Sequence, residues 1–267
     1  MDTASTAPYP APWAIVTGAS SGIGAEVARA LAERGYRLRL VARREDRLQA
    51  LAARLPTEAA CVAVDLADAD ALAAALPALA EGRVEVLVNN AGMGDNRRFL
   101  DQPDALTRSM MQVHFFAAAT LIRAVLPGML ANGVGHVWNV ASIATKWGPG
   151  GHSTYVAAKN ALIGLTQSLG IDYADRGVAF TYVNPGLVRT EFFDHPSYAG
   201  LRGTLGKRGI APAQVARRMV RLLDRPQPEL CVPAHFRLAD AIRALSPALM
   251  QRIVRRESHP ADADFDG

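Results

Sequence analysis

A glycine-rich turn near the start of the chain constrains the fold more than any other feature of this sequence. Residues 18–24 read GASSGIG; they follow a short apolar run at residues 14–17 and precede a helix expected at about residues 25–34. A turn between a buried strand and a helix brings backbone N–H groups and the positive end of the helix to a phosphate. Glycine at Gly18, Gly22 and Gly24 lets a pyrophosphate and the neighbouring strand approach closely. The segment predicts a dinucleotide-binding turn, with a purely structural turn as the alternative.

The rest of the chain alternates short apolar runs with helical segments. Further strands are expected at residues 37–41, 61–64, 84–88, 135–140 and 179–183, and helices up to residue 55, at 69–79, at about 103–126, up to about 173, and at 212–223. All-apolar strands are typical of a parallel sheet that is buried on both faces. Because no linker or repeat interrupts the alternation, the sequence predicts a single α/β domain over residues 13–257. We expect a doubly wound, Rossmann-type parallel sheet with helices on both faces.

The segments outside the regular alternation have distinct compositions. Residues 1–12 are expected to form a disordered leader, without the basic start and apolar centre of a signal peptide. Residues 190–211 are punctuated by glycine and rich in aromatic residues, as a mobile substrate lid would be. Residues 237–257 place Ile242, Leu245, Leu249 and Ile253 on one face of a helix that Pro247 interrupts. This amphipathic segment can pack on the domain, on a second subunit or on a lipid surface, with packing favoured; residues 258–267 are expected to be frayed.

Charge and cysteine content exclude several classes of protein. The formal net charge is only +4 and the arginines are scattered, so we expect no nucleic-acid partner. Two cysteines, Cys61 and Cys231, are too few for a disulfide framework and lack metal-ligand spacing, which favours a reducing compartment and no metal. We find no apolar run close to the ~20 residues of a membrane span. The sequence therefore predicts a soluble, cytoplasmic protein.

A second set of chemically important residues lies in the middle of the chain. Ser142 follows the strand at residues 135–140, and Tyr155 and Lys159 lie four residues apart on the next helix, so that they project from the same face. A free phenol has a pKa of about 10, and a neighbouring cation moves it toward the working range of an acid–base catalyst. Ser142 could hold the oxygen of a carbonyl or alcohol. Taken alone, the Tyr/Lys spacing favours a core tyrosine beside a solvated lysine, because the pattern is common; the glycine turn at the other end of the chain reverses that preference.

Two arginines follow the second strand, where a dinucleotide fold contacts the adenosine ribose. Arg43 and Arg44 suit the 2′-phosphate of NADP, whereas an acidic residue would select NAD. The alternative is that both are solvated residues at the start of the next helix. Asp65, after the third strand, could accept from the adenine amino group or cap the following helix. The amide-rich strand end at residues 89–92 could stabilise the sheet and leave space under the ribose.

Together these motifs resemble those of the short-chain dehydrogenase/reductase family. The resemblance covers roughly residues 14–190 and includes, in order, TGASSGIG at 17–24, Asp65, NNAG at 89–92, Ser142, Tyr155-x-x-x-Lys159 and the pair Pro185 and Gly186. It implies that Tyr155 is the general acid that protonates a carbonyl oxygen. It also implies that Lys159 lowers the Tyr155 pKa and binds the nicotinamide ribose, and that Ser142 orients the substrate oxygen.

The expected cofactor-binding set combines the glycine turn, the strand ends and the positions that the resemblance implies. It comprises Gly18, Ser20, Ser21, Gly22, Ile23, Gly24, Arg43, Arg44, Asp65, Leu66, Asn90, Ala91, Gly92, Tyr155, Lys159, Pro185, Gly186, Val188 and Thr190. The expected substrate pocket comprises Met93, Ser142, Trp147, His152, Phe192, Phe193 and also Tyr198, each of which could equally serve in packing.

One position departs from the family pattern. His114 stands where the family usually has an asparagine that supports a water in the proton relay. A neutral histidine satisfied by packing is slightly favoured, and a histidine that joins the relay is the alternative, since imidazole both donates and accepts.

The sequence predicts an NADP(H)-dependent oxidoreductase that interconverts an apolar ketone or aldehyde and an alcohol. Two alternatives are a non-catalytic NADP(H)-binding protein, favoured only by His114, and a cofactor-independent lyase or dehalogenase, which the intact glycine turn opposes. The resemblance also implies a homodimer or homotetramer formed through the helix after NNAG and the Tyr/Lys helix. The small residues 117–119 would permit close packing between subunits.

Overall fold

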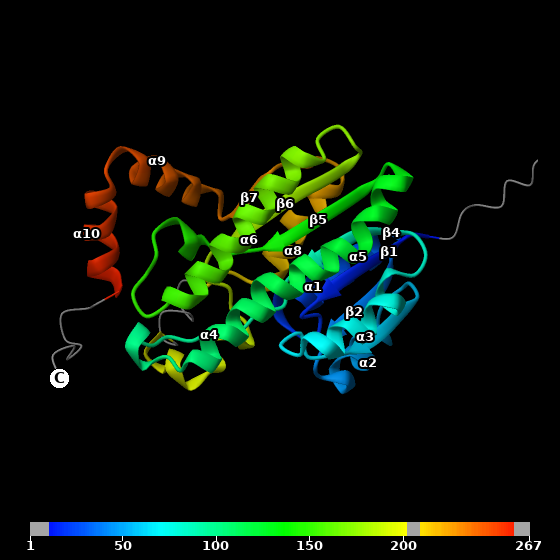
Figure 1. The fold of residues 1–267 in the computed structure, drawn as a ribbon, viewed down its shortest axis with the longest axis horizontal. Helices are drawn as coiled ribbons and strands as arrows, with labels where there is room; N and C mark the ends of the chain where they lie inside the picture. Colours follow the sequence, from blue (N-terminus) through cyan, green and yellow to red (C-terminus); the bar gives the residue numbers. More distant parts are fainter. Residues whose placement is uncertain (1–10, 202–208, 259–267) are drawn as a thin grey trace, which may run out of the picture.

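The computed structural model describes residues 11–201 and 209–258. Residues 1–10 of the expected leader, 202–208 of the expected lid and 259–267 of the expected tail lie outside the described residues. The described residues form a seven-stranded parallel sheet in the order β3-β2-β1-β4-β5-β6-β7 (Figure 1). The strands are β1 Trp13–Thr17, β2 Arg37–Ala42, β3 Ala59–Ala63, β4 Val84–Asn89, β5 Gly135–Val140, β6 Val178–Pro185 and β7 Glu229–Val232. The prediction of a doubly wound parallel sheet is confirmed.

Helices cover both faces of the sheet. One hydrophobic cluster joins the sheet to α1 (Gly22–Glu33), α2 (Glu45–Ala52) and α8 (Pro212–Val220). A second cluster joins the opposite face to α3 (Ala69–Ala80), α5 (Ala117–Asn132) and α6 (Ser153–Asp172). Alternate residues of β1 enter the two clusters, Ala14 and Val16 one and Ile15 the other, because side chains of a strand alternate between faces. Two buried faces explain the uniformly apolar strands.

The strand order reverses between β1 and β4, which leaves a crevice at the carboxyl edge of the sheet. Polar strand ends hold this edge together. The Thr17 hydroxyl accepts from the backbone N–H groups of Asn90 (2.9 Å) and Ala91 (3.0 Å). Asn89 Nδ2 donates to Asn139 Oδ1 at 2.8 Å, which joins the ends of β4 and β5. The amide-rich strand end therefore stabilises the sheet beside the crevice.

Several element boundaries differ from those expected. The edge strand β7 was missed, because its four residues ELCV begin with a charge and form a weak pattern. β3 begins two residues before the expected start, and α2 ends at Ala52, short of residue 55. The expected helix 103–126 is a continuous run of α4 (Asp104–Met111), a π-helical turn η2 (Gln112–Phe116) and α5. It continues past Pro127 to Gly133, whose left-handed conformation (φ 64°) ends it, because Met129 beyond the proline is still buried in the core.

This continuous helix corrects the expectation that no apolar run approaches the length of a membrane span. Residues 104–132 are long and apolar enough to cross a membrane by length and composition, with a mean hydropathy of 1.6 in their most apolar window. Half of that window is buried inside the domain, and core helices commonly pass the same test. The small residues Ala117, Ala118 and Ala119 are buried at 0%, 4% and 7% exposure. They pack within their own domain, which leaves little of their surface for contacts between subunits.

The C-terminal segment forms an arm of two helices beside the domain. Helices α9 (Leu238–Leu245) and α10 (Pro247–Ser258) stand at one side of the fold, away from the sheet (Figure 1). The break at Pro247 is as predicted. The arm buries Ala239 and Met250, whereas the four residues of the predicted apolar face are exposed, namely Ile242 (37%), Leu245 (87%), Leu249 (45%) and Ile253 (41%). That face is only partly covered among the described residues.

Candidate active site

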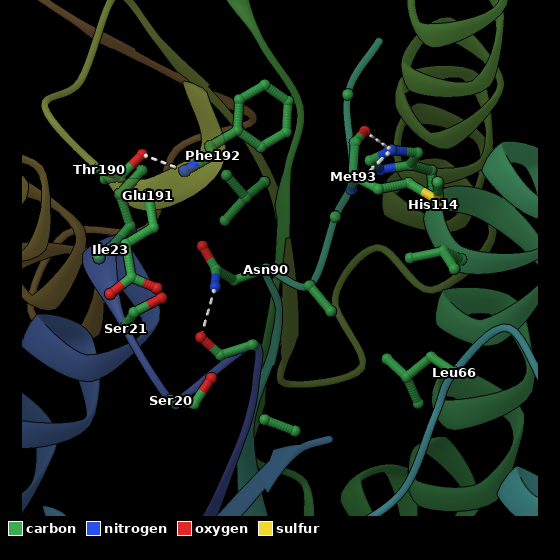
Figure 2. Close-up of a pocket in the computed structure, with 18 of the residues that line it drawn as sticks. Ser20, Ser21, Ile23, Leu66, Asn90, Met93, His114, Thr190, Glu191 and Phe192 are labelled. Carbon is green, nitrogen blue, oxygen red and sulfur yellow. Dashed lines mark hydrogen bonds between the residues drawn. The ribbon is translucent and has the colours of Figure 1, made fainter. Parts of the chain in front are cut away.

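A cavity of about 660 Å³ opens at the carboxyl edge of the sheet. It runs from the glycine turn to the segment after β6, and Figure 2 shows residues of both ends facing it. Of the predicted residues, its lining contains Gly18, Ser20, Ser21, Gly22, Ile23, Arg43, Arg44, Asp65, Leu66, Asn90, Ala91, Gly92, Met93, His114, Ser142, Tyr155, Lys159, Pro185, Gly186, Val188, Thr190, Phe192 and Phe193. The fold therefore brings the two predicted sets of residues, far apart in sequence, to one cavity.

The glycine turn has the geometry that only glycine allows. Gly18 has a φ of +65°, and a Cβ there would lie 2.9 Å from Ala91 Cα. Gly22 has a φ of +57°, and a Cβ there would lie 2.9 Å from Thr190 Cγ2. Ser21 begins α1 without a side-chain cap, which leaves the first N–H groups of the helix available at the cavity. These features fit a pyrophosphate.

Gly24 has a different role from the other two glycines. It is buried and is not part of the cavity lining among the described residues. A Cβ at this position would lie only 2.3 Å from the Gly18 carbonyl oxygen. Gly24 therefore lets the first turn of α1 pack against the glycine turn and does not itself face a ligand.

The adenosine end of the cavity holds the two predicted arginines. Arg44 donates to the hydroxyls of Ser20 (2.9 Å) and Ser21 (3.0 Å), whereas Arg43 extends into solvent, 3.9 Å from Asp65. The prediction that Asp65 caps α3 is wrong. Asp68 caps that helix by accepting from the N–H groups of Asp70 and Ala71, and Asp65 accepts from Ala67 N in the turn before it. The Asp65 side chain thus stays at the cavity rim.

Three elements position the catalytic candidates. Ser142 lies just beyond β5 and caps the short helix η3 (Ile143–Lys146) by accepting from Ala144 N. Tyr155 and Lys159 project from the first turns of α6 and are 9% and 3% exposed. Lys159 Nζ donates to the Val140 carbonyl at 2.6 Å and lies 5.9 Å from the centre of the Tyr155 ring. The shared helix face and the strand end thus gather these groups in one place.

Burial dominates the electrostatics of this group. It raises the pKa of Tyr155 to about 12, although hydrogen bonding with Ser142 acts in the opposite direction. It lowers the pKa of Lys159 to about 7. The net direction for Tyr155 is therefore opposite to the lowering expected from Lys159. A lysine that is itself partly neutral near pH 7 has less charge with which to stabilise a phenolate, and desolvation of the phenol prevails.

His114 lies against the Gly92–Met93 segment, as Figure 2 shows. Its Nε2 is 2.7 Å from the Met93 carbonyl oxygen, and its ring meets that of Tyr155 edge-on at 5.4 Å. Burial, together with the positive charge of Lys159, holds the pKa of His114 well below its ordinary value, so the ring is neutral. Nδ1 is buried and has no hydrogen-bond partner among the described residues. The histidine is thus only partly satisfied by packing.

The predicted substrate walls divide into two groups. Met93, Phe192 and Phe193 line the cavity, and the Phe192 ring lies 5.8 Å from that of Tyr155. Trp147 and His152 are absent from the lining among the described residues. Trp147 packs on Phe236 at 5.6 Å.

His152 packs on Tyr155 and on the fully buried Tyr198, which itself lies behind Phe192 and Phe193. These ring contacts place His152 and Tyr198 behind the aromatic wall, which they support.

Several lining residues escaped the sequence interpretation. Ser109 and Val113 line the cavity one helical turn apart on the segment that carries His114. They share a helix face with each other, but neither stands three or four residues from His114, so helical spacing from His114 does not identify them. Glu191 and His195 line the cavity from the segment after β6. No spacing signal distinguishes them, because the segment is irregular.

The sequence matches the family of short chain dehydrogenases over residues 12–197. The chain is 30% identical to the Bos taurus "Dehydrogenase/reductase SDR family member 7B" over 258 residues, covering 90% of this chain and 79% of that protein. A solved structure, "Short-chain dehydrogenase from Sphingobium yanoikuyae in complex with NADPH", superposes with a TM-score of 0.78 at 30% identity over 94% of this chain and 98% of the other. The "bulky-bulky ketone specific alcohol dehydrogenase from Comamonas testosteroni" gives a TM-score of 0.75 at 26% identity, covering 95% and 97%.

Proposed function

The chain belongs to the short-chain dehydrogenase family, and on that premise we propose that it is an NADP(H)-dependent oxidoreductase that interconverts a ketone or aldehyde and an alcohol. The observation that carries the proposal is the gathering of Ser142, Tyr155 and Lys159 at one end of a cavity whose other end is the uncapped glycine turn. A cofactor bound along the cavity would supply the hydride, while these side chains handle the oxygen and its proton.

In this mechanism the chain's own residues hold and move one proton. Tyr155 keeps its proton at neutral pH because burial raises its pKa to about 12, so a proton is available for a carbonyl oxygen. The Ser142 hydroxyl beside it is placed to donate to the same oxygen. Lys159, buried and hydrogen-bonded to the Val140 carbonyl, favours the phenolate left after proton transfer whenever it is charged.

The proposed preference for NADP(H) over NAD(H) rests on the second strand end. Arg44 reaches the hydroxyls of Ser20 and Ser21 in the glycine turn, and Arg43 extends into solvent with 76% of its side chain exposed, 3.9 Å from Asp65. Both present guanidinium groups that suit a phosphate monoester. NADPH is also the ligand named for the Sphingobium yanoikuyae structure.

The aromatic wall supports a bulky, apolar carbonyl substrate. Phe192 and Phe193 face the cavity beside Tyr155, and Met93 faces it from the end of β4. The Comamonas testosteroni structure named for bulky ketones has a similar fold over nearly its whole length. We further propose that the protein acts in the cytoplasm as a homo-oligomer.

Titration with NADPH and NADH, followed by a panel of ketones and aldehydes, tests the proposal. We expect NADPH-dependent reduction that falls by about 10²- to 10⁴-fold in Tyr155→Phe, because general acid catalysis contributes about that factor. The variant should still bind NADPH, since it keeps the ring of Tyr155 and leaves the glycine turn unchanged. Tight NADPH binding without turnover of any carbonyl would favour the alternative of a non-catalytic NADP(H)-binding protein.

His114 gives that alternative its only support from the sequence. We propose that it positions the Gly92–Met93 segment through the Met93 carbonyl; its Nδ1, buried and without a partner among the described residues, is the atom that a relay water would have to reach. If His114 takes part in the relay, His114→Asn should change the pH–rate profile. A profile identical to that of the parent would leave His114 a positioning residue.

A further inference from the structure

A carboxylate from the segment after β6 lies between two arginines at the adenosine end of the cavity. Glu191 Oε2 accepts from Arg44 at 2.7 Å and Oε1 accepts from Arg47 at 2.5 Å. Glu191 begins the short helix η4 (Glu191–Asp194), more than 140 residues away from both arginines in sequence. In Figure 2 its carboxylate reaches down beside Ser20 and Ser21 of the glycine turn. The contact therefore joins the expected lid to the cofactor site.

The two arginines form an anion site of the kind that a phosphate monoester uses. Arg44 is held in place by the Ser20 and Ser21 hydroxyls, at 2.9 and 3.0 Å, and Arg47 lies on the first turns of α2 beside it. Each guanidinium gives one N–H to a different oxygen of Glu191. The two arginines hold the pKa of Glu191 below its ordinary value, so the group is ionised. A carboxylate bound this way presents oxygens and negative charge as a phosphate does.

Glu191 is also tied to the substrate end of the cavity. Its neighbour Thr190 packs on Gly22, where an added Cβ would meet the threonine methyl at 2.9 Å. Thr190 Oγ1 accepts from Phe192 N, and the Phe192 ring lies 5.8 Å from that of Tyr155. Glu191 is therefore the direct neighbour in sequence of a residue in the aromatic wall.

We propose that Glu191 occupies, in the cofactor-free protein, the anion site that Arg44 and Arg47 offer to the 2′-phosphate of NADP(H). The 2′-phosphate displaces the carboxylate, and the segment Glu191–Asp194 is released from the adenosine end. Arg47 thereby becomes a further residue that selects NADP(H), and Glu191 links recognition of the 2′-phosphate to the wall formed by Phe192. The inference rests on the proposed preference for NADP(H).

Binding of adenosine 2′,5′-bisphosphate and adenosine 5′-monophosphate to the full chain, measured by calorimetry, isolates the 2′-phosphate. Glu191→Gln removes the competing charge, so the bisphosphate should bind about two- to fivefold more tightly, the range that exposed ion pairs give. Affinity for the monophosphate should change much less. Arg47→Gln should weaken bisphosphate binding and leave monophosphate binding nearly unchanged.

Glu45→Gln is the matched control. Glu45 stands next to Arg44 in sequence and carries the same charge, but its carboxylate accepts from Gln49 and takes no part in the arginine pair's contacts with Glu191. Its substitution should give less gain in bisphosphate affinity than Glu191→Gln. Equal gains in the two variants would show a general effect of net charge and overturn the inference.

Hydrogen exchange provides an independent measure of the released segment. The amides of residues 191–194 should exchange faster in the presence of the bisphosphate than of the monophosphate, and Glu191→Gln should exchange fast without ligand. Unchanged or weaker bisphosphate binding by Glu191→Gln would overturn the inference while leaving the NADP(H) preference intact. A parent protein that binds both nucleotides equally would overturn the preference itself, and the inference with it.

Discussion

At the scale of single residues, Tyr155 and Lys159 show how burial alters groups that the sequence can only place. The two lie on one face of α6 and are almost completely removed from solvent. Desolvation disfavours the charged form of each, so it raises the pKa of the phenol and lowers that of the ammonium. The sequence suggests a charged Lys159 beside a phenolate of Tyr155. In the folded chain the shifts favour the neutral amine of Lys159 and the neutral phenol of Tyr155.

The Lys159 shift makes a prediction about stability and pH. The folded pKa is about 7 and the ordinary value is 10.5, so the unfolded chain binds more protons between these values. The burial cost of Lys159 is therefore complete below about pH 7 and disappears as pH rises toward 10.5. We expect Lys159→Met to gain stability relative to the parent, because the cost of burying the charge is removed. The difference in free energy of unfolding, variant minus parent, should be largest near pH 6 and should decrease toward pH 10. Urea unfolding of both proteins across this range measures it; a difference that is constant with pH would contradict the shift.

At the scale of elements, a buried ion cluster fastens the C-terminal arm to the active-site edge of the sheet. Lys146, 5% exposed, ends the helix η3 that follows Ser142. Its ammonium donates to Glu229 of β7 at 2.7 Å and also to Asp240 of α9. Glu229 accepts in addition from Asn184 of β6 at 2.8 Å. One lysine thus holds β7, α9 and the turn that carries Ser142.

Removing Lys146 from this cluster should lower the free energy of unfolding by an amount that depends on pH. Burial acts to raise the pKa of Glu229, but the hydrogen bond from Lys146 and others outweigh it and the pKa lies below 4.5. A depressed carboxyl pKa contributes stability above about pH 4.5 that is lost as pH falls through the folded value. Lys146→Met should therefore lower the free energy of unfolding by about 3 kcal/mol at pH 7, as loss of one partner of a buried pair does. The deficit should shrink toward pH 4, and chemical denaturation at both pH values checks it.

The comparison variant for the cluster is Asp240→Asn. Asp240 is the most exposed partner of Lys146, with 43% of its side chain accessible, so its loss should cost much less than that of Lys146. Equal losses in free energy of unfolding for the two variants at pH 7 would contradict the prediction, because they would show that the burial of Lys146 and Glu229 does not determine how much the cluster contributes to stability.

At the scale of the whole molecule, large apolar side chains remain exposed on two of the helices that the family resemblance assigns to subunit contacts. Phe116, at the end of η2 where α5 begins, is 51% exposed, and Ile171 on α6 is 79% exposed. Because Ala117 to Ala119 are almost completely buried, Phe116 and Ile171 are the better candidates for contacts in the proposed homo-oligomer. Large exposed apolar residues of this kind are typical of interfaces.

Phe116→Glu tests this arrangement. A charge at the centre of an apolar contact should raise the dissociation constant by about tenfold or more, since such residues commonly contribute over 1 kcal/mol. Phe99→Glu is the control, because Phe99 is 64% exposed but belongs to η1 (Phe99–Asp101), outside α5 and α6. Light scattering over a dilution series measures the mass of each variant. Equal dissociation of both variants would place the interface elsewhere.

The sequence by itself determined the architecture and most of the cavity lining. The apolar period of the strands, the glycine turn and the Tyr/Lys spacing are local patterns, and local patterns fix which elements form and which side chains share a face. The carboxyl ends of parallel strands then meet at one edge, so that residues as distant as Gly22 and Thr190 approach each other.

Only the tertiary structure decided what depends on contacts between distant segments. It placed Trp147 and His152 behind the wall, gave the cap of α3 to Asp68, added β7 as an edge strand and left the arm's apolar face only partly covered. It also set the charge states of Tyr155 and Lys159, because desolvation depends on everything packed around a group. The pairing of Glu191 with Arg44 and Arg47 also depends on the tertiary structure, because the spacing of charged residues in a sequence does not indicate which of them the fold brings together.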